Sequence, residues 1–212
     1  MKFTFFYINL KQNKNMKKII LSMVAVMAFG FANAQDKKEM SEGFSKGDIY
    51  MSGSFGFNST KTGDNKTDGF EIKPTLGFFV TENIAIGASL GFETSKQTAT
   101  PDDIKTTDLS FNVFGRYYCT PASKFSVFGQ LEAGYMTSKV EQGDAEAKSN
   151  GFGLGLGLGV SYFLSDHWAM EAGWAGLSYQ TSKPDFDGAE KTDNFGLNLN
   201  LTDINFGLLY KF

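Results

Sequence analysis

The sequence predicts an all-β fold, an eight-stranded antiparallel up-and-down transmembrane β-barrel, and three observations support this prediction. Eight segments alternate apolar with small or polar residues at a period of two, at about the 9–11 residues that a tilted strand needs to cross a bilayer. The connections between them alternate between short turns and long polar loops, as in outer-membrane barrels. The ionisable residues within the segments lie on the face opposite the apolar set, which makes that face the lumen.

The segment 151–162, GFGLGLGLGVSY, has the most regular alternation. One face carries Phe, Leu, Val and Tyr, and the other carries only Gly and Ser. Glycine in a strand costs roughly 0.5–1 kcal/mol relative to Ala, so a bare face needs a structural reason. The interior of an eight-stranded barrel is only just wide enough for side chains, and a bare strand leaves room for large ones opposite. The apolar face, with an aromatic residue at each end, is typical of a lipid-facing surface.

The other seven segments follow the same alternation. They are expected at 49–58, 70–80, 84–93, 109–118, 125–135, 168–174 and 204–212. Short turns are expected at 81–83, 119–124 and 165–167, and long polar loops at 59–69, 94–106, 137–150 and 180–193. With the short turns in the periplasm, an even number of strands puts both termini there and the long loops outside the cell.

Two positions interrupt the pattern. Pro74 lies inside the second segment, where it removes a hydrogen-bond donor from the ladder, and a bulge there would tolerate it. Near Thr202 and Asp203 the apolar residues change from odd to even positions, which predicts a β-bulge. The part before this bulge would extend above the membrane, and 204–212 would cross it.

The N-terminal residues predict export. From Met16, an alternative start of the chain, a pair of lysines precedes an apolar run and the small-residue site Ala-Asn-Ala at 32–34, which is the pattern of a cleaved signal peptide. The predicted organisation is a signal peptide over 1–34, a flexible periplasmic lead-in over 35–47 and an outer-membrane barrel over 48–212.

Composition excludes other classes of function. The chain has 20 Lys and Arg against 23 Asp and Glu, and removal of 1–34 takes away five lysines and no acid, so the mature net charge is about −8. An acidic exported chain is a poor binder of nucleic acid, and no nucleic-acid partner is expected. The single cysteine, Cys119, cannot form an internal disulfide.

Four charged residues are predicted to form a polar network in the lumen. They share the inward phase and are Lys73, Arg116, Glu132 and Glu171. Counted from the short turns, Lys73 and Glu132 fall at similar height, and the other two lie lower. We hypothesise that these residues form salt bridges that fill the barrel, and a generic polar interior is the alternative.

The sequence predicts no catalytic, cofactor-binding or metal site. A hydrolytic site normally needs a His base, and the single histidine, His167, falls in a predicted periplasmic turn, where an interfacial structural role is expected. The first long loop suggests a calcium loop only superficially, because Lys66 occupies a ligand position and Thr75 stands where a glutamate is required. The acidic loops leave weak divalent-cation binding open.

The last residues resemble the C-terminal assembly signal of outer-membrane barrels. Gly207 is followed by aromatic residues at the third-last and last positions, Tyr210 and Phe212. The resemblance implies recognition by the barrel-assembly machinery and by periplasmic chaperones during biogenesis. An amphipathic final strand is the alternative.

The region 48–212 resembles the outer membrane protein β-barrel domain family, whose OmpA/OmpX-type members are small eight-stranded barrels. The resemblance rests on the eight alternating segments, on PTLGFF at 74–79 running into IAIG at 84–87, on RYY at 116–118 and on the terminal YKF. It implies location in the outer membrane of a Gram-negative cell, contact with outer-membrane lipid, and no cofactor. Because the sequence ends on the barrel, without the peptidoglycan-binding domain of OmpA, cell-wall tethering is not expected.

The first hypothesis for function is a non-enzymatic structural or small pore-like protein with a lumen largely filled by polar side chains. The second is a loop-mediated binding or adhesion module of the cell surface, which would use Pro184, Phe186 and the polar loops. A soluble exported lipocalin-like barrel is disfavoured, because its interior would be apolar and its glycine face would meet water. A lipid-modifying barrel enzyme is disfavoured by the position of His167.

Overall fold

The structure, a computed structural model, describes residues 42–99, 102–198 and 204–212. The chain divides into two compact units, Met1–Gln35 and Asp36–Phe212, and every described residue belongs to the second. Within the described part of the chain, no helix is long and apolar enough to span a membrane. The predicted signal peptide, 1–34, lies outside the described residues.

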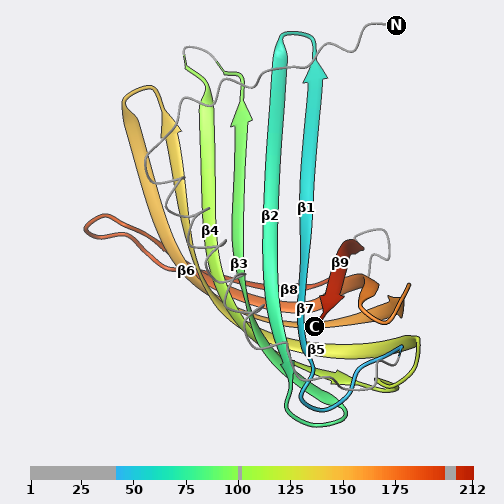
Figure 1. Cartoon of the computed structure of the whole chain (residues 1–212). Helices are drawn as coiled ribbons and strands as arrows, with labels where there is room; N and C mark the ends of the chain where they lie inside the picture. The colour runs from blue at the N-terminus through green and yellow to red at the C-terminus, as the bar shows by residue number, and fades with distance from the viewer. Residues whose placement is uncertain (1–41, 100–101, 199–203) are drawn as a thin grey trace, which may run out of the picture. The chain divides into compact units, whose positions relative to one another are not determined.

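The described unit is a closed all-β barrel, as predicted. Its strands are β1 (Ile49–Thr62), β2 (Asn65–Phe79), β3 (Ile84–Gln97), β4 (Ile104–Tyr118), β5 (Phe125–Gln142), β6 (Ala145–Phe163), β7 (Trp168–Pro184), β8 (Thr192–Leu197) and β9 (Asn205–Lys211). Consecutive strands pair antiparallel from β1 to β7, and β8 and β9 both pair with β7 as two parts of the eighth strand (Figure 1). β9 also pairs with β1 over Tyr50–Gly53, which closes the sheet. Closure satisfies backbone groups between strands, as a hydrocarbon environment requires.

The two faces of the barrel follow the predicted alternation. Outward positions face one another across the ladders, for example Leu131 opposite Leu156. These large apolar side chains are exposed on the surface rather than buried, which fits contact with lipid. On β6 the outward face runs from Phe152 to Tyr162, ten residues apart. This separation is about 33 Å along the strand and roughly 25 Å along the axis of a barrel with the usual strand tilt, the height of an outer-membrane apolar band.

The polar loops predicted between the strands are mostly extensions of the strands themselves. β5 and β6 stay paired up to Gln142 and Ala145, inside the predicted loop 137–150. The turn closes at Gly143, whose φ of +57° is in the region that favours glycine. The predicted loops 59–69 and 94–106 are shortened in the same way. The end of the apolar alternation therefore marks the end of the apolar band, whereas the ladder continues beyond it.

The change from odd to even apolar positions, which the sequence shows near the C-terminus, is matched by a register shift in the neighbouring strand β7. Leu156 pairs with Leu177, but the next residue, Gly157, pairs with Ala175, so β7 contains one extra residue at this point. The outward positions of β7 change there from even to odd numbers, and β8 is in register with the odd part. The sequence placed the bulge near 202–203, which lies outside the described residues.

Pro74 is accommodated without a change of register. The β2–β3 pairing stops at Ile72 and resumes at Thr75 with the same register. On the other side of the strand, Pro74 stays opposite Gly53. The missing donor of proline thus coincides with a short break in one ladder, and no bulge is needed.

Inward-facing glycines accept large side chains from the neighbouring strand. In the glycine strand β6, Gly159 lies opposite Phe128, and a Cβ at that position would overlap the phenyl ring. Gly77 receives the ring of Tyr50 in the same way. The bare face of β6 therefore has the predicted purpose of making room for bulky side chains.

The buried core lies at the short-turn end, which we define by the connections 80–83, 119–124 and 164–167. Its residues are Phe44, Tyr50, Phe79, Ala85, Tyr118, Phe128, Phe163, Ala169 and Leu209. Phe44 belongs to the segment 35–47, which the sequence predicted to be a flexible lead-in. That prediction is wrong for residues 42–47, because Phe44 has an exposed fraction of 0%. The rest of the segment lies outside the described residues.

Candidate functional site

An aromatic stopper closes the short-turn end of the lumen. We use this term for Phe44 and the four rings around it. The ring centroid of Phe44 lies 4.6 Å from Phe79, 4.8 Å from Phe163, 5.2 Å from Tyr118 and 5.5 Å from Tyr50. These separations fall in the range of favourable aromatic pairs, about 4.5–7 Å. The rings come from four different parts of the barrel wall, so the stopper spans its mouth.

The backbone around Phe44 fixes the stopper in place. The N–H of Phe44 donates to the carbonyl oxygen of Pro121 at 2.7 Å, and Nζ of Lys211 donates to the carbonyl oxygen of Gly43 at 2.6 Å. Gly43 has a φ of +113°, and a Cβ there would lie 2.5 Å from the carbonyl carbon of Ala122. Only glycine satisfies both constraints at this position.

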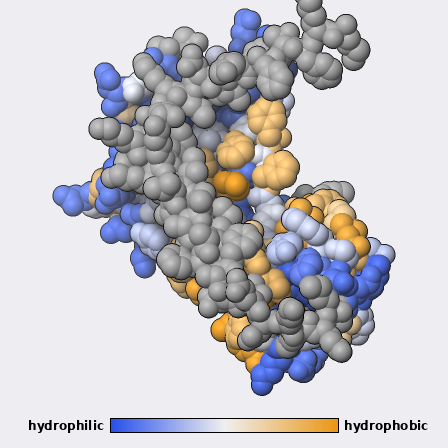
Figure 2. Space-filling view, viewed as in Figure 1, coloured by the Kyte–Doolittle hydropathy of each residue, from blue (hydrophilic) through white to orange (hydrophobic). Residues whose placement is uncertain are grey.

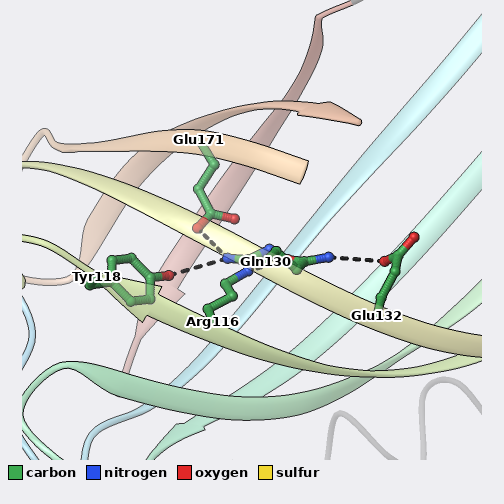
Figure 3. Close-up of polar contacts among 5 residues, drawn as sticks. All are labelled: Arg116, Tyr118, Gln130, Glu132 and Glu171. Carbon is green, nitrogen blue, oxygen red and sulfur yellow. Dashed lines mark hydrogen bonds and ion pairs between the residues drawn. The ribbon is translucent and has the colours of Figure 1, made fainter. Parts of the chain in front are cut away.

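Arg116 and Glu171 form a buried ion pair next to the stopper (Figure 3). Nη1 of Arg116 lies 2.7 Å from Oε1 of Glu171, and their side chains are only 10% and 9% exposed. The guanidinium also donates to Gln130 and to the hydroxyl of Tyr118, and it lies 4.4 Å from the ring centroid of Phe128. A buried pair is tolerated when its remaining polar atoms find partners, and Arg116 has several.

Lys73 and Glu132 form a looser pair in more open surroundings. Nζ of Lys73 lies 3.8 Å from Oε2 of Glu132, and their side chains are 43% and 31% exposed. Nε2 of Gln130 donates to the same carboxylate oxygen at 2.9 Å. The four charged residues singled out in the sequence therefore face the lumen as two pairs, and Gln130, which sequence reasoning missed, connects them (Figure 3).

A cavity of about 200 Å³ adjoins both pairs. Its lining includes Lys73, Arg116, Gln130, Glu132, Trp174 and Asn205. Glycines of β6 and β7 leave part of its wall without side chains. The lining is mixed, with charged and apolar side chains, and the space has room for a cluster of water molecules.

Three further carboxylates, not singled out in the sequence, line the lumen nearer the hairpin tips. Glu71 lies opposite Glu93, and Glu93 lies opposite Asp108. Within the described residues, none of the three has a cationic partner within 4.0 Å. Like charges directly opposite one another are destabilising, so this part of the lumen is strongly negative. No cluster of three or more His, Cys, Asp or Glu side chains suited to a metal ion occurs in the described ranges.

His167 and the C-terminal residues lie together at the short-turn rim. Nδ1 of His167 is 2.7 Å from the carbonyl oxygen of Lys211, and its ring stacks on Tyr210 at 5.4 Å. Tyr210 also meets Phe212 edge-on at 5.1 Å. Gly207 lies in the closing strand, where a Cβ would approach the β1 backbone to 3.2 Å. The single histidine thus holds the end of the last strand.

The model of one protein family, described as the outer membrane protein beta-barrel domain, matches residues 21–212. The chain belongs to this family. As a member of the outer membrane protein beta-barrel domain family, it is located in the outer membrane and is in contact with membrane lipid. The family resemblance stated from the sequence is therefore confirmed.

The chain is similar to solved outer-membrane barrels, and the first of them shows the same fold. OprG from Pseudomonas aeruginosa is 16% identical, with a TM-score of 0.51 over 81% of this chain and 99% of that one. Neisserial surface protein A is 15% identical, with a TM-score of 0.48 over 77% and 97% of the two chains. The barrel domain of Pseudomonas aeruginosa OprF is 12% identical, with a TM-score of 0.46 over 80% and 100%. No curated protein sequence matches the chain.

Proposed function

We propose that this member of the outer membrane protein beta-barrel domain family is a non-enzymatic structural protein whose lumen is closed at rest and passes at most small ions. The aromatic stopper carries the proposal, because Phe44 is fully buried inside the barrel mouth. Arg116 and Glu171 fill the adjoining layer with paired charge. The cavity of about 200 Å³ beside this layer is small enough to limit passage to small ions.

The proposal includes an orientation in the membrane. The short-turn end holds residues 42–48 and Phe212, whose N–H donates to the carbonyl oxygen of Ile49 at 3.0 Å. A chain delivered from the periplasm, after cleavage of the predicted signal peptide 1–34, would leave both termini there and the long hairpins outside the cell. Recognition by the barrel-assembly machinery and periplasmic chaperones fits the half-buried aromatic rim formed by Tyr210 and Phe212.

Planar-bilayer conductance tests the closed lumen. We expect the refolded wild-type barrel to show only small current steps. Phe44→Ala should give larger and more frequent steps, because it removes the central ring of the stopper. Phe186→Ala is the matched control, since that ring is 66% exposed at a hairpin tip. Large stable channels in the wild type, or unchanged currents from a folded Phe44→Ala barrel, would refute the proposal.

A second candidate function is loop-mediated binding at the cell surface. Phe186 is exposed at the tip between β7 and β8, and the N–H of Asp185 donates to the carbonyl oxygen of Lys148 at 2.8 Å, which holds this tip against β6. An exposed aromatic side chain on a fixed support is a common contact in binding surfaces. Adhesion of cells displaying the barrel to collagen-coated and mucin-coated surfaces should then fall in Phe186→Ala, while Phe44→Ala leaves adhesion unchanged.

A further inference from the structure

One lysine in each strand from β1 to β7 lies at the same height on the outward face of the barrel. These residues form what we call the lysine belt: Lys61, Lys66, Lys96, Lys105, Lys139, Lys148 and Lys183. Each is four residues beyond an outward aromatic or leucine residue of its own strand, towards the hairpin tip. The seven apolar residues are Phe57, Phe70, Phe92, Leu109, Tyr135, Phe152 and Tyr179. Hydrophilic side chains are visible at the ends of the hairpins and also at the short-turn end (Figure 2).

The belt lies where a bilayer has its head groups. Four residues along a strand are about 13 Å, or roughly 10 Å along the barrel axis at the usual tilt. The lysines are therefore just beyond the apolar band, and their long side chains can reach back to its edge. An even spacing of four keeps every lysine on the lipid-facing side. The belt thus faces the lipid head groups, whereas the carboxylates Glu71, Glu93 and Asp108 of the same barrel face the lumen.

The ladder brings belt lysines together in like-charged pairs. Lys61 lies opposite Lys66, and Lys96 lies opposite Lys105. Lys139 lies opposite Lys148 in the β5–β6 hairpin. Like charges directly opposite one another destabilise a sheet. Glu146 already bridges Lys139 and Lys148, at 2.7 and 2.8 Å, so the pairs Lys61–Lys66 and Lys96–Lys105 are the ones that favour a bridging anion.

Carboxylates within the belt neutralise it only in part. Six of them lie beside the belt lysines: Asp68, Asp103, Glu141, Glu146, Asp185 and Asp193. Some pairs are close, such as Lys66 with Asp68 at 2.7 Å. Lys105 has its carboxylate at 3.9 Å, and in the described part of the chain Lys61 and Lys183 have none within 4.0 Å. Seven lysines against six carboxylates leave the belt with one net positive charge, although the mature protein is acidic.

We propose that the lysine belt binds the phosphate groups of anionic lipids in the leaflet that the long hairpins cross. Charge complementarity supports this partner. The position of the belt supports it too, because every belt lysine lies beside the apolar band, which can contact the acyl chains of a lipid. A Lys ammonium donates up to three hydrogen bonds to phosphate oxygens. A phosphate between Lys61 and Lys66, or between Lys96 and Lys105, would remove the repulsion within the pair.

Lipid retention by the full mature protein tests the proposal. The barrel is reconstituted in nanodiscs of equimolar phosphatidylglycerol and phosphatidylcholine, and the lipids that remain bound after mild extraction are quantified by native mass spectrometry. Wild type should be enriched in phosphatidylglycerol. Lys61→Gln/Lys183→Gln should reduce the enrichment at least about fivefold, since each lysine near a membrane surface contributes close to a fivefold preference. Lys61→Arg/Lys183→Arg should retain it.

A control variant, Lys46→Gln/Lys73→Gln, removes the same charge outside the belt and should leave the enrichment unchanged. Each variant is checked for folding by its heat-modifiable gel mobility. Equal loss of enrichment in the control variant would overturn the proposal, because the effect would then follow net charge. Displacement of the lipid by millimolar inorganic phosphate would overturn it too, since the belt would then be a site for free phosphate. Unchanged enrichment in the folded belt variant would have the same consequence.

Discussion

Removal of Glu171 should destabilise the barrel far more than removal of Glu132. Glu171→Ala leaves the guanidinium of Arg116 buried without its counter-ion, and breaking a buried pair in this way costs about 3–5 kcal/mol. Gln130, Tyr118 and the ring of Phe128 remain as partners of Arg116, so we expect a loss near 3 kcal/mol in the free energy of unfolding. Glu132→Ala should cost less than about 1 kcal/mol, because its pair with Lys73 is 3.8 Å long and partly exposed.

The double replacement Arg116→Met/Glu171→Leu separates pairing from packing. Without either charge, no uncompensated ion remains in the lumen, so the double variant should be more stable than Glu171→Ala. The free energy of unfolding is measured in lipid vesicles by guanidinium titration, followed by tryptophan emission and by gel mobility. If the loss in the double variant equals the sum of the losses in Arg116→Met and Glu171→Leu, the two residues are not coupled and the reasoning is wrong.

Three further predictions concern other parts of the barrel. Gly159→Val should lower the free energy of unfolding by about 1–3 kcal/mol, because it displaces Phe128. Gly129→Val on the outward face, where a Cβ meets nothing within 4 Å, should be nearly neutral. Urea unfolding in vesicles compares the two variants. Gly43→Ala should open the short-turn mouth as Phe44→Ala does, which bilayer conductance would record. Phosphatidylglycerol enrichment should rise only as the pH falls below the usual range of carboxyl groups. Hydrogen bonds from Lys139 and Lys148 hold the pKa of Glu146 below that range, so the carboxylate, which also faces Glu141, releases both lysines only when the pH falls through the lowered value.

The strands and their faces were predictable because a lipid-facing barrel imposes one rule on every span. A side chain such as Leu156 must be apolar since it meets acyl chains, and its neighbours must be small since the lumen is narrow. The sequence therefore records the phase of each strand directly. Charged residues mark the opposite face, because they are costly in lipid. Arg116 and Glu171 could therefore be assigned to the lumen from the sequence alone.

The stopper could not be predicted in the same way. Phe44 is a single aromatic residue in a polar segment, and one residue has no period. Its position depends on the diameter of the mouth, on the carbonyl of Pro121 and on the left-handed backbone of Gly43, none of which is a local property of the chain. The pair Gly43-Phe44, in a segment otherwise rich in charge, is the one signal that could have suggested an anchored residue.

The extra residue in β7 was missed for a related reason. Between Trp174 and Leu177 the sequence does not show where the phase changes, because Gly176 has no side chain to identify the face. The change becomes visible only when β7 is paired with β6, where Leu156 and Gly157 fix the register on each side. Local composition thus identifies strands, and pairing partners are needed to locate irregularities within them.

Height along the barrel axis, together with phase, specifies what each charge can do. Lys73 and Lys139 are both strand residues with carboxylate partners, yet one faces the lumen and the other faces lipid head groups. Phase alone separates the lumen from the outside, and the distance from the aromatic rows separates the apolar band from the lysine belt. A lysine four residues beyond an outward aromatic can hold a lipid phosphate. The same residue moved eight positions back along its strand would lie near the middle of the apolar band, at a cost of up to about 2–4 kcal/mol. The regular spacing of the belt in β1 to β7 is therefore what an anionic lipid surface would select.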